Sequence, residues 1–184
     1  RHYSTEVSGI GVVEKIEHKV GTEDYRKKII HTVTYNITEV FLPPKQDNSC
    51  CSTEIEATAI SELVNKLIDE KKDPAKLRLH WHSHVNMTTF HSGVDEENYE
   101  GLNNNDFLVS LVLNKRKEML GRIDIYSPIA VAFINVPVFI GAFAPEAVRE
   151  KIDVNIKALD DFIKSSNRQG NKFGGSNWNY EKIW

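Results

Sequence analysis

The sequence contains little cysteine, and the two cysteines that it has cannot form a disulfide framework. Cysteine occurs only twice in 184 residues, at the adjacent positions Cys50 and Cys51. Neighbours in sequence rarely form a disulfide, because the required geometry strains the backbone. No second cysteine pair exists to complete a metal site, so we interpret both as loop residues. A chain without a disulfide framework fits a reducing compartment, and we expect a cytoplasmic protein.

The chain also lacks a large charge of either sign and a long apolar run. Its net charge is -3, which gives no electrostatic footprint for nucleic acid and no basic face for an anionic membrane. Spanning a membrane takes about 20 consecutive apolar residues. The most apolar stretch, 129–143, is interrupted by Asn135, Pro137 and Gly141. We therefore expect neither a nucleic-acid nor a membrane partner.

Segments rich in β-branched and aromatic residues predict several strands. Gly9 and Gly11 lie inside the first of them, and predict that another part of the chain approaches its backbone closely. The range 45–52 is polar and is interpreted as a loop. The predicted strands cover 7–16, 29–42, 77–81, 107–113, 119–126 and 129–140.

Helical spacing predicts a first helix that Ser52 or Thr53 caps and that ends before Pro74. A short helix or loop follows at 95–104, and an amphipathic helix at 145–165. Strands and helices alternate without a strict pattern, so the predicted fold class is mixed α/β. We expect one domain over 1–165 and a polar tail or linker, with some aromatic residues, over 166–184.

A cluster of histidines follows the strand predicted at 77–81. Residues separated by one position in a strand point to the same side, so either His80 with His82 or His82 with His84 could bind one metal ion. Asp95, eleven residues after His84, can supply a third ligand. Two histidines and one carboxylate leave a position open, which is typical of catalytic rather than structural zinc. Cobalt, manganese or iron would also suit these ligands.

The same stretch resembles the motif of the JAMM (MPN-plus) zinc metalloproteases. That motif has an upstream Glu, then His-x-His, seven residues, Ser, two residues and Asp. The resemblance covers about residues 5–140 and selects the second histidine pair, leaving His80 as a bystander. One departure is Val85, where the family usually has Pro. The matching positions are Glu6 and Gly9 of an upstream Glu-x-x-Gly segment, then His82, His84, Ser92 and Asp95.

The resemblance implies a mixed β-sheet flanked by helices, in a three-layer arrangement like that of cytidine deaminases. It implies one zinc ion per chain, held by His82, His84 and Asp95. Glu6 would act as general base, taking a proton from water and giving it to the leaving amine. Ser92 would hydrogen-bond the oxyanion.

Members of that family hydrolyse amide bonds, often the isopeptide bond at the C-terminus of ubiquitin or a ubiquitin-like protein. A zinc-dependent peptidase or isopeptidase with a ubiquitin-like substrate is therefore the expected function. The substrate tail could add to a strand edge supplied by residues 10–13 or by the region after Asp95. The main alternative is a non-catalytic scaffold of the same fold. A zinc deaminase would need a His-x-Glu segment and a Cys-x-x-Cys pair, and the sequence has neither.

Overall fold

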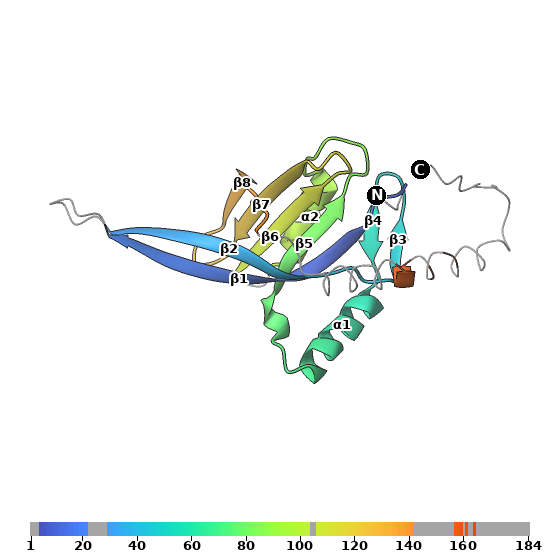
Figure 1. Cartoon of the computed structure of the whole chain (residues 1–184), viewed down its shortest axis with the longest axis horizontal. Helices are drawn as coiled ribbons and strands as arrows, with labels where there is room; N and C mark the ends of the chain where they lie inside the picture. Colours follow the sequence, from blue (N-terminus) through green and yellow to red (C-terminus); the bar gives the residue numbers. More distant parts are fainter. Residues whose placement is uncertain are drawn as a thin grey trace.

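The computed structural model describes residues 4–21, 29–103 and 106–141, together with 157–159, 161 and 164. Its centre is a six-stranded sheet in the order β2-β1-β5-β6-β7-β8 (Figure 1). Only β5 and β6 run parallel, and the other neighbours are antiparallel. A mixed sheet with a few helices confirms the predicted α/β class. The strands are β1 (Ser8–Gly21), β2 (Ile29–Phe41), β5 (Leu77–Ser83), β6 (Phe107–Leu113), β7 (Met119–Ile125) and β8 (Val131–Val136).

Smaller elements fill two of the connections between these strands. Between β2 and β5 lie a two-stranded sheet and two helices, and between β5 and β6 lies one helix. A parallel pair needs such a crossover, since a hairpin can join only antiparallel strands. These elements are β3 (Gln46–Asn48), β4 (Thr53–Ile55), α1 (Ala57–Asp69), the 3₁₀-helix η1 (Pro74–Lys76) and α2 (Gly93–Gly101).

The predicted start of the first helix was wrong. Helix α1 begins at Ala57 after Glu56, which makes no side-chain cap hydrogen bond. Thr53 lies in β4 instead, and its hydroxyl is 2.9 Å from that of Ser8 and donates to the Asn48 carboxamide oxygen at 2.7 Å. These tertiary partners replace the helix N–H groups that a capping threonine would accept from. The polar loop predicted at 45–52 likewise contains β3.

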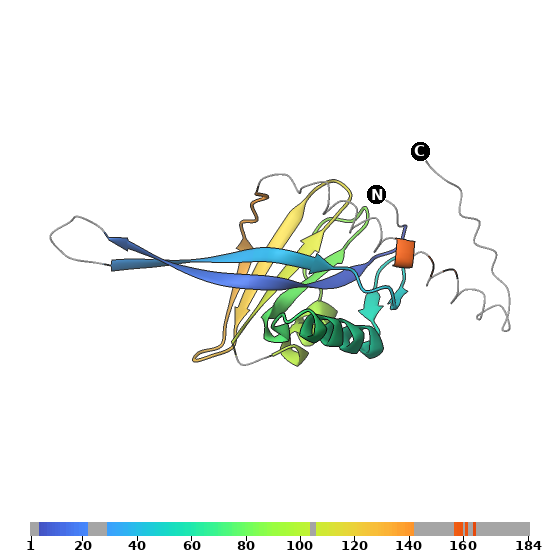
Figure 2. The same cartoon turned by 60° about the horizontal axis from the view of Figure 1, so that its bottom comes forward.

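The first strand is longer than predicted. It continues to Gly21 and pairs with β2 from Ile10 to that end, whereas it pairs with β5 only from Ser8 to Val12. The rest of β1 and β2 is a two-stranded ribbon that projects from the sheet (Figure 2). The close approach predicted at Gly9 is confirmed. A Cβ atom there would lie 2.2 Å from the Phe41 carbonyl oxygen and 2.5 Å from the Trp81 ring.

Alternation along β5 separates the core from the histidines. Leu79 is buried in the main hydrophobic cluster, and Trp81 packs against it. His80, His82 and His84 alternate with these residues and so face the other side of the sheet. The remaining buried members of the cluster are Val13, Phe107, Val109 and Ile123.

The C-terminal predictions are met only in part by the described residues. Strand β8 covers 131–136 of the predicted strand at 129–140. Within the helix predicted at 145–165, residues 157–159, 161 and 164 are helical, and Leu159 is fully buried. The predicted tail at 166–184 lies outside the described residues. Among the helices that the structure describes, none combines the length and the apolar character needed to cross a membrane.

Candidate metal centre

The pairing of β1 with β5 brings Glu6 next to the histidines. Ser8 is the register partner of His82, and the Ser83 N–H donates to the Val7 carbonyl at 2.9 Å. Continuing this register by one residue places Glu6 opposite His84. Directly opposed residues of an antiparallel pair point to the same face. The upstream Glu therefore shares a face with both histidines, although 76 positions separate Glu6 from His82.

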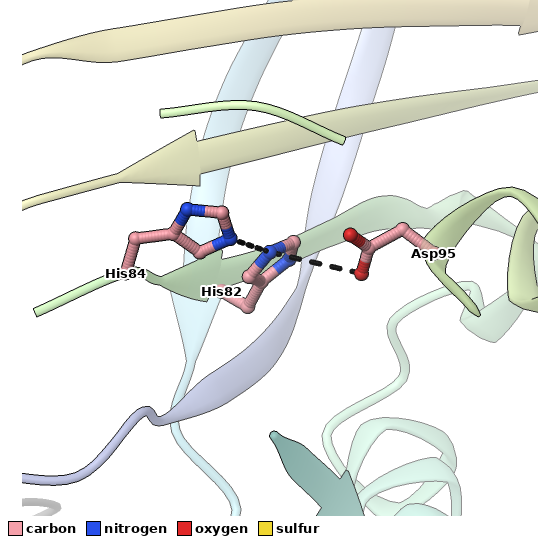
Figure 3. A group of neighbouring side chains, drawn as sticks. All are labelled: His82, His84 and Asp95. Carbon is pink, nitrogen blue, oxygen red and sulfur yellow. Dashed lines mark hydrogen bonds and ion pairs between the residues drawn. The ribbon is translucent and has the colours of Figure 1, made fainter. Parts of the chain in front are cut away.

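His82, His84 and Asp95 converge on one point (Figure 3). Their candidate ligand atoms all lie within 4.8 Å of one another. The Nε2 atoms of the two histidines are 3.1 Å apart, and His82 Nε2 is 3.7 Å from Asp95 Oδ1. Two nitrogens at about 2.0–2.1 Å from one tetrahedral zinc ion would lie about 3.3 Å apart. The spacing of the ligand atoms thus suits a single small metal ion.

A backbone carbonyl fixes the orientation of His84. Its Nδ1 lies 2.8 Å from the Thr88 carbonyl oxygen, which can only accept, so Nδ1 carries the proton. In the neutral ring, the lone pair is then on Nε2, the atom that faces His82. Histidines that bind metals are commonly oriented by such a hydrogen bond on the other ring nitrogen. The loop between the two ligand elements therefore positions a ligand as well as connecting them.

Asp95 is oriented by the residue that caps its helix. The Ser92 N–H and the Ser92 hydroxyl each donate to Asp95 Oδ2 at 2.7 Å, and the Asp95 N–H donates to Ser92 Oγ at 3.2 Å. This reciprocal arrangement is a capping box at the start of α2. It occupies Oδ2 and leaves Oδ1 toward His82. Desolvation opposes the effect, but the Ser92 hydrogen bonds and, when His82 is protonated, its charge lower the pKa of Asp95.

Helix α2 is fixed to the sheet by contacts on its buried side. Tyr99 is almost fully buried, and its carbonyl accepts from the Tyr126 hydroxyl at 2.6 Å. Arg122 on β7 donates to Glu96 at 3.0 Å and lies over the Tyr99 ring. These residues hold the helix that carries Asp95. Sequence analysis missed both Tyr99 and Arg122, because nothing in their local pattern marks them.

Glu6 is a buried acid beside this group. Its side chain is 3% exposed, and its Oε1 has no hydrogen-bond partner among the described residues. Burial, the largest cause, raises its pKa, while the charge of His84 lowers it and that of Asp95 raises it. A buried carboxyl oxygen without a partner is costly. A site that receives a water or a substrate N–H next to the metal ligands would give it one.

Burial also keeps His82 neutral. Desolvation lowers its pKa to about 4, against the raising effect of Asp95. A histidine must be neutral to bind a metal ion. At neutral pH, His82 therefore does not have to lose a proton before it binds a metal ion. The donor set, two imidazole nitrogens and one carboxylate, fits zinc and related divalent ions.

The other histidines of the stretch do not join the group. His80 is on the same face, its ring centroid 6.0 Å from that of His82, but it is not among the three converging residues. The role of His80 as a bystander stays a prediction. His91 Nδ1 lies 2.7 Å from the Tyr99 hydroxyl.

Ser83, which lies between the two histidine ligands in sequence, does not face the site. Its hydroxyl accepts from the Val7 N–H at 3.1 Å and so links β5 to the segment before β1.

Val85, the departure from the motif, has an unusual backbone. Its φ is 45°, a left-handed conformation that is rare for a β-branched residue. Proline fixes φ near -65°, so it could not adopt this conformation. Hydrogen bonds from the Lys115 N–H to the Val85 carbonyl and from the His84 N–H to the Leu113 carbonyl, both 2.7 Å, hold the turn. The loop after His84 is therefore shaped by the β6–β7 hairpin.

Neither of the strand edges proposed for substrate is free. Residues 10–13 lie in β1, where β2 pairs on one side and β5 on the other over most of the range. The region after Asp95 is helix α2. The expectation for residues 10–13 was wrong, because the sequence does not reveal that β1 is an inner strand, and the residues directly after Asp95 are helical. Within the described six-stranded sheet, the edges are β2 and β8.

Comparison with known proteins adds no family assignment. No protein-family model matches the sequence, and no curated protein matches it. The interpretation of the site consequently depends on its own geometry and on the motif spacing.

Proposed function

We propose that the chain is a zinc-dependent peptidase or isopeptidase of the JAMM type, with the fold of that family. The observation that carries the proposal is the convergence of His82, His84 and Asp95 beside the buried carboxyl of Glu6, whose Oε1 has no hydrogen-bond partner among the described residues. Three ligands and a separate acid form a set suited to hydrolysis. A structural zinc site would instead be closed by a fourth protein ligand.

In this proposal, His82, His84 and Asp95 hold the zinc ion. When bound, zinc supplies Lewis acidity, which polarises a carbonyl and lowers the pKa of water to about 7. Ser92 orients Asp95, since its N–H and hydroxyl both donate to Oδ2. Thr88 orients His84 through its carbonyl.

Glu6 is the proposed general base. Burial raises the pKa of Glu6 toward neutral pH. A base whose pKa lies near the working pH both accepts a proton and gives it up readily. It would accept a proton from the attacking water at its free Oε1 and deliver it to the nitrogen of the departing amine. Burial excludes bulk water that could compete for this proton.

The proposed substrate is an amide at the C-terminus of a ubiquitin-like protein, a class that the motif resemblance implies. Ser92 is the proposed oxyanion donor. Its hydroxyl proton is directed at Asp95 Oδ2 in this structure. To donate to an oxyanion, the hydroxyl would have to rotate away from Asp95 while the Ser92 N–H keeps that carboxylate in place.

The test is a hydrolysis assay with the full chain and a ubiquitin-like protein that carries a fluorophore amide on its C-terminus. We expect turnover that a chelator abolishes and that added zinc restores. Chelator-sensitive zinc binding without hydrolysis of any tail amide would favour the scaffold alternative. Hydrolysis that persists after complete zinc removal would contradict the proposal.

A further inference from the structure

The β3–β4 hairpin is hydrogen-bonded to the segment that contains Glu6. The Glu6 N–H donates to the Ser49 carbonyl at 2.8 Å. Gln46 Nε2 donates to the Ser8 carbonyl at 2.8 Å, and the Ser8 N–H donates to Gln46 Oε1 at 3.1 Å. The Thr53 and Ser8 hydroxyls are 2.9 Å apart. The hairpin therefore sets the position of residues 6–8 from the side opposite β5 (Figure 1).

The turn of this hairpin contains both cysteines of the chain. The Ser49 N–H donates to the Ser52 carbonyl at 2.8 Å, which closes the turn, and the Cys51 N–H donates to Ser49 Oγ at 3.1 Å. Cys50 and Cys51 are both free thiols and both exposed. Their sulfur atoms are 3.0 Å apart. The side chains thus already face each other.

We propose that Cys50 and Cys51 form a modification site for a small disulfide oxidant of the glutathione type. One thiolate attacks the external disulfide, forming a mixed disulfide and releasing one small thiol. The second cysteine sulfur then attacks the mixed disulfide and releases the second small thiol. The two cysteine thiols are oxidised to one disulfide, and the external disulfide is reduced to two thiols.

Strain makes this site reversible. A disulfide between adjacent residues is strained, and strained, exposed disulfides are the more easily reduced ones. The ring closes and reopens as the ratio of oxidised to reduced thiol changes.

Ring closure acts on Glu6 through Ser49. Bringing the sulfurs from 3.0 Å to a bonded distance of about 2.05 Å moves the backbone that directly follows Ser49. The Ser49 carbonyl accepts the Glu6 N–H, so the oxidised turn weakens that hydrogen bond. An effect on catalysis depends on the proposed role of Glu6, whereas ring formation and the weaker hydrogen bond do not.

The zinc-loaded full chain can be equilibrated in glutathione buffers of increasing oxidation, alkylated and weighed intact. We expect the oxidised protein to lose the mass of two hydrogens and to carry no alkyl group, with full reversal by reduced glutathione. Cys50→Ser is the matched control, because it keeps the turn but cannot close the ring. Two alkylated thiols in excess oxidant, or a glutathione adduct or disulfide-linked dimer as the main product, would overturn the modification site.

Hydrogen exchange of the Glu6 amide tests the coupling without any hydrolysis assay. We expect faster exchange at Glu6 in the oxidised protein than in the reduced one, and no change in Cys50→Ser under the same buffers. Equal exchange in the oxidised and reduced forms would overturn the coupling. Neither of these experiments measures zinc-dependent hydrolysis. Failure of the proposed function and failure of this inference therefore give different results.

Discussion

Ser92 and Asp95 bond each other in both directions: the Ser92 N–H and hydroxyl donate to Asp95 Oδ2, and the Asp95 N–H donates to Ser92 Oγ. The Ser-x-x-Asp spacing is thus the spacing of a helix capping box. The same two residues start helix α2 and aim Oδ1 of Asp95 toward His82.

Replacing Ser92 by Ala should weaken zinc binding about 10- to 100-fold, as expected when an orienting partner of a metal ligand is lost. The lost cap should also lower the free energy of unfolding by about 1 kcal/mol. Zinc affinity can be measured by competition with a chromophoric chelator. Ser92→Thr, which keeps the hydroxyl, is the control. A variant that binds zinc normally but turns over slowly would assign Ser92 to the oxyanion instead.

Zinc content should distinguish the three histidines that alternate along the end of β5 and directly after it. His82→Ala and His84→Ala each remove a converging nitrogen, so elemental analysis should find little zinc in either variant. His80→Ala should retain about one zinc per chain, because His80 lies outside the converging group. The ligand assignment fails if His84→Ala retains its zinc or if His80→Ala loses it.

Gly9→Ala should destabilise the fold strongly. Its Cβ would lie 2.2 Å from the Phe41 carbonyl oxygen and 2.5 Å from the Trp81 ring, so the sheet must shift. Overpacking of this kind costs about 1–3 kcal/mol, which urea denaturation can measure. The matched control is Gly101→Ala in α2, where no atom lies within 4 Å of the added Cβ. Equal stability of the two variants would contradict the pairing of β1 between β2 and β5.

Acid should destabilise the zinc-free protein between about pH 6.5 and pH 4. Burial lowers the pKa values of His80, His82 and His91, to about 4 for His82. The unfolded chain then takes up protons near pH 6.5, before the folded chain does, so stability present above that pH is lost on acidification. Glu6, whose pKa is raised by burial, acts in the opposite direction.

The measurement is urea unfolding of chelator-treated protein at pH 7 and pH 5. We expect a lower free energy of unfolding at pH 5, because three histidines outweigh one carboxyl. His82→Asn should show a smaller difference between the two pH values. A protein that is equally or more stable at pH 5 would mean that these histidines are not buried as neutral rings.

Local periodicity was enough to predict which face of β5 carries the histidines. In the structure the residues that alternate with these histidines lie on the other side, Leu79 in the core cluster and Trp81 against it. Spacing alone left two histidine pairs open, and only the motif resemblance selected His82, His84 and Asp95, the three residues that lie together in the structure. These features depend on strand geometry and on a short loop, both of which are local properties of the sequence.

Features that depend on distant partners could not be predicted. Thr53 resembled a helix cap, but its hydroxyl bonds Ser8 and Asn48. The Thr88 carbonyl that orients His84 and the Gln46 side chain that bonds both backbone groups of Ser8 carry no sequence signal. Each of these contacts depends on how β1, β5 and the β3–β4 hairpin come together.

In the proposed mechanism, Glu6 transfers protons at a zinc site that it does not ligate. Glu6→Gln keeps the size of the side chain but cannot accept a proton. The decisive measurement is the turnover of a ubiquitin-like tail amide by Glu6→Gln and by the wild-type chain, with the zinc content of both preparations. We expect unchanged zinc content and a loss of turnover of about 10²- to 10⁴-fold in Glu6→Gln. Equal turnover in the two proteins, or zinc lost along with activity, would contradict this mechanism.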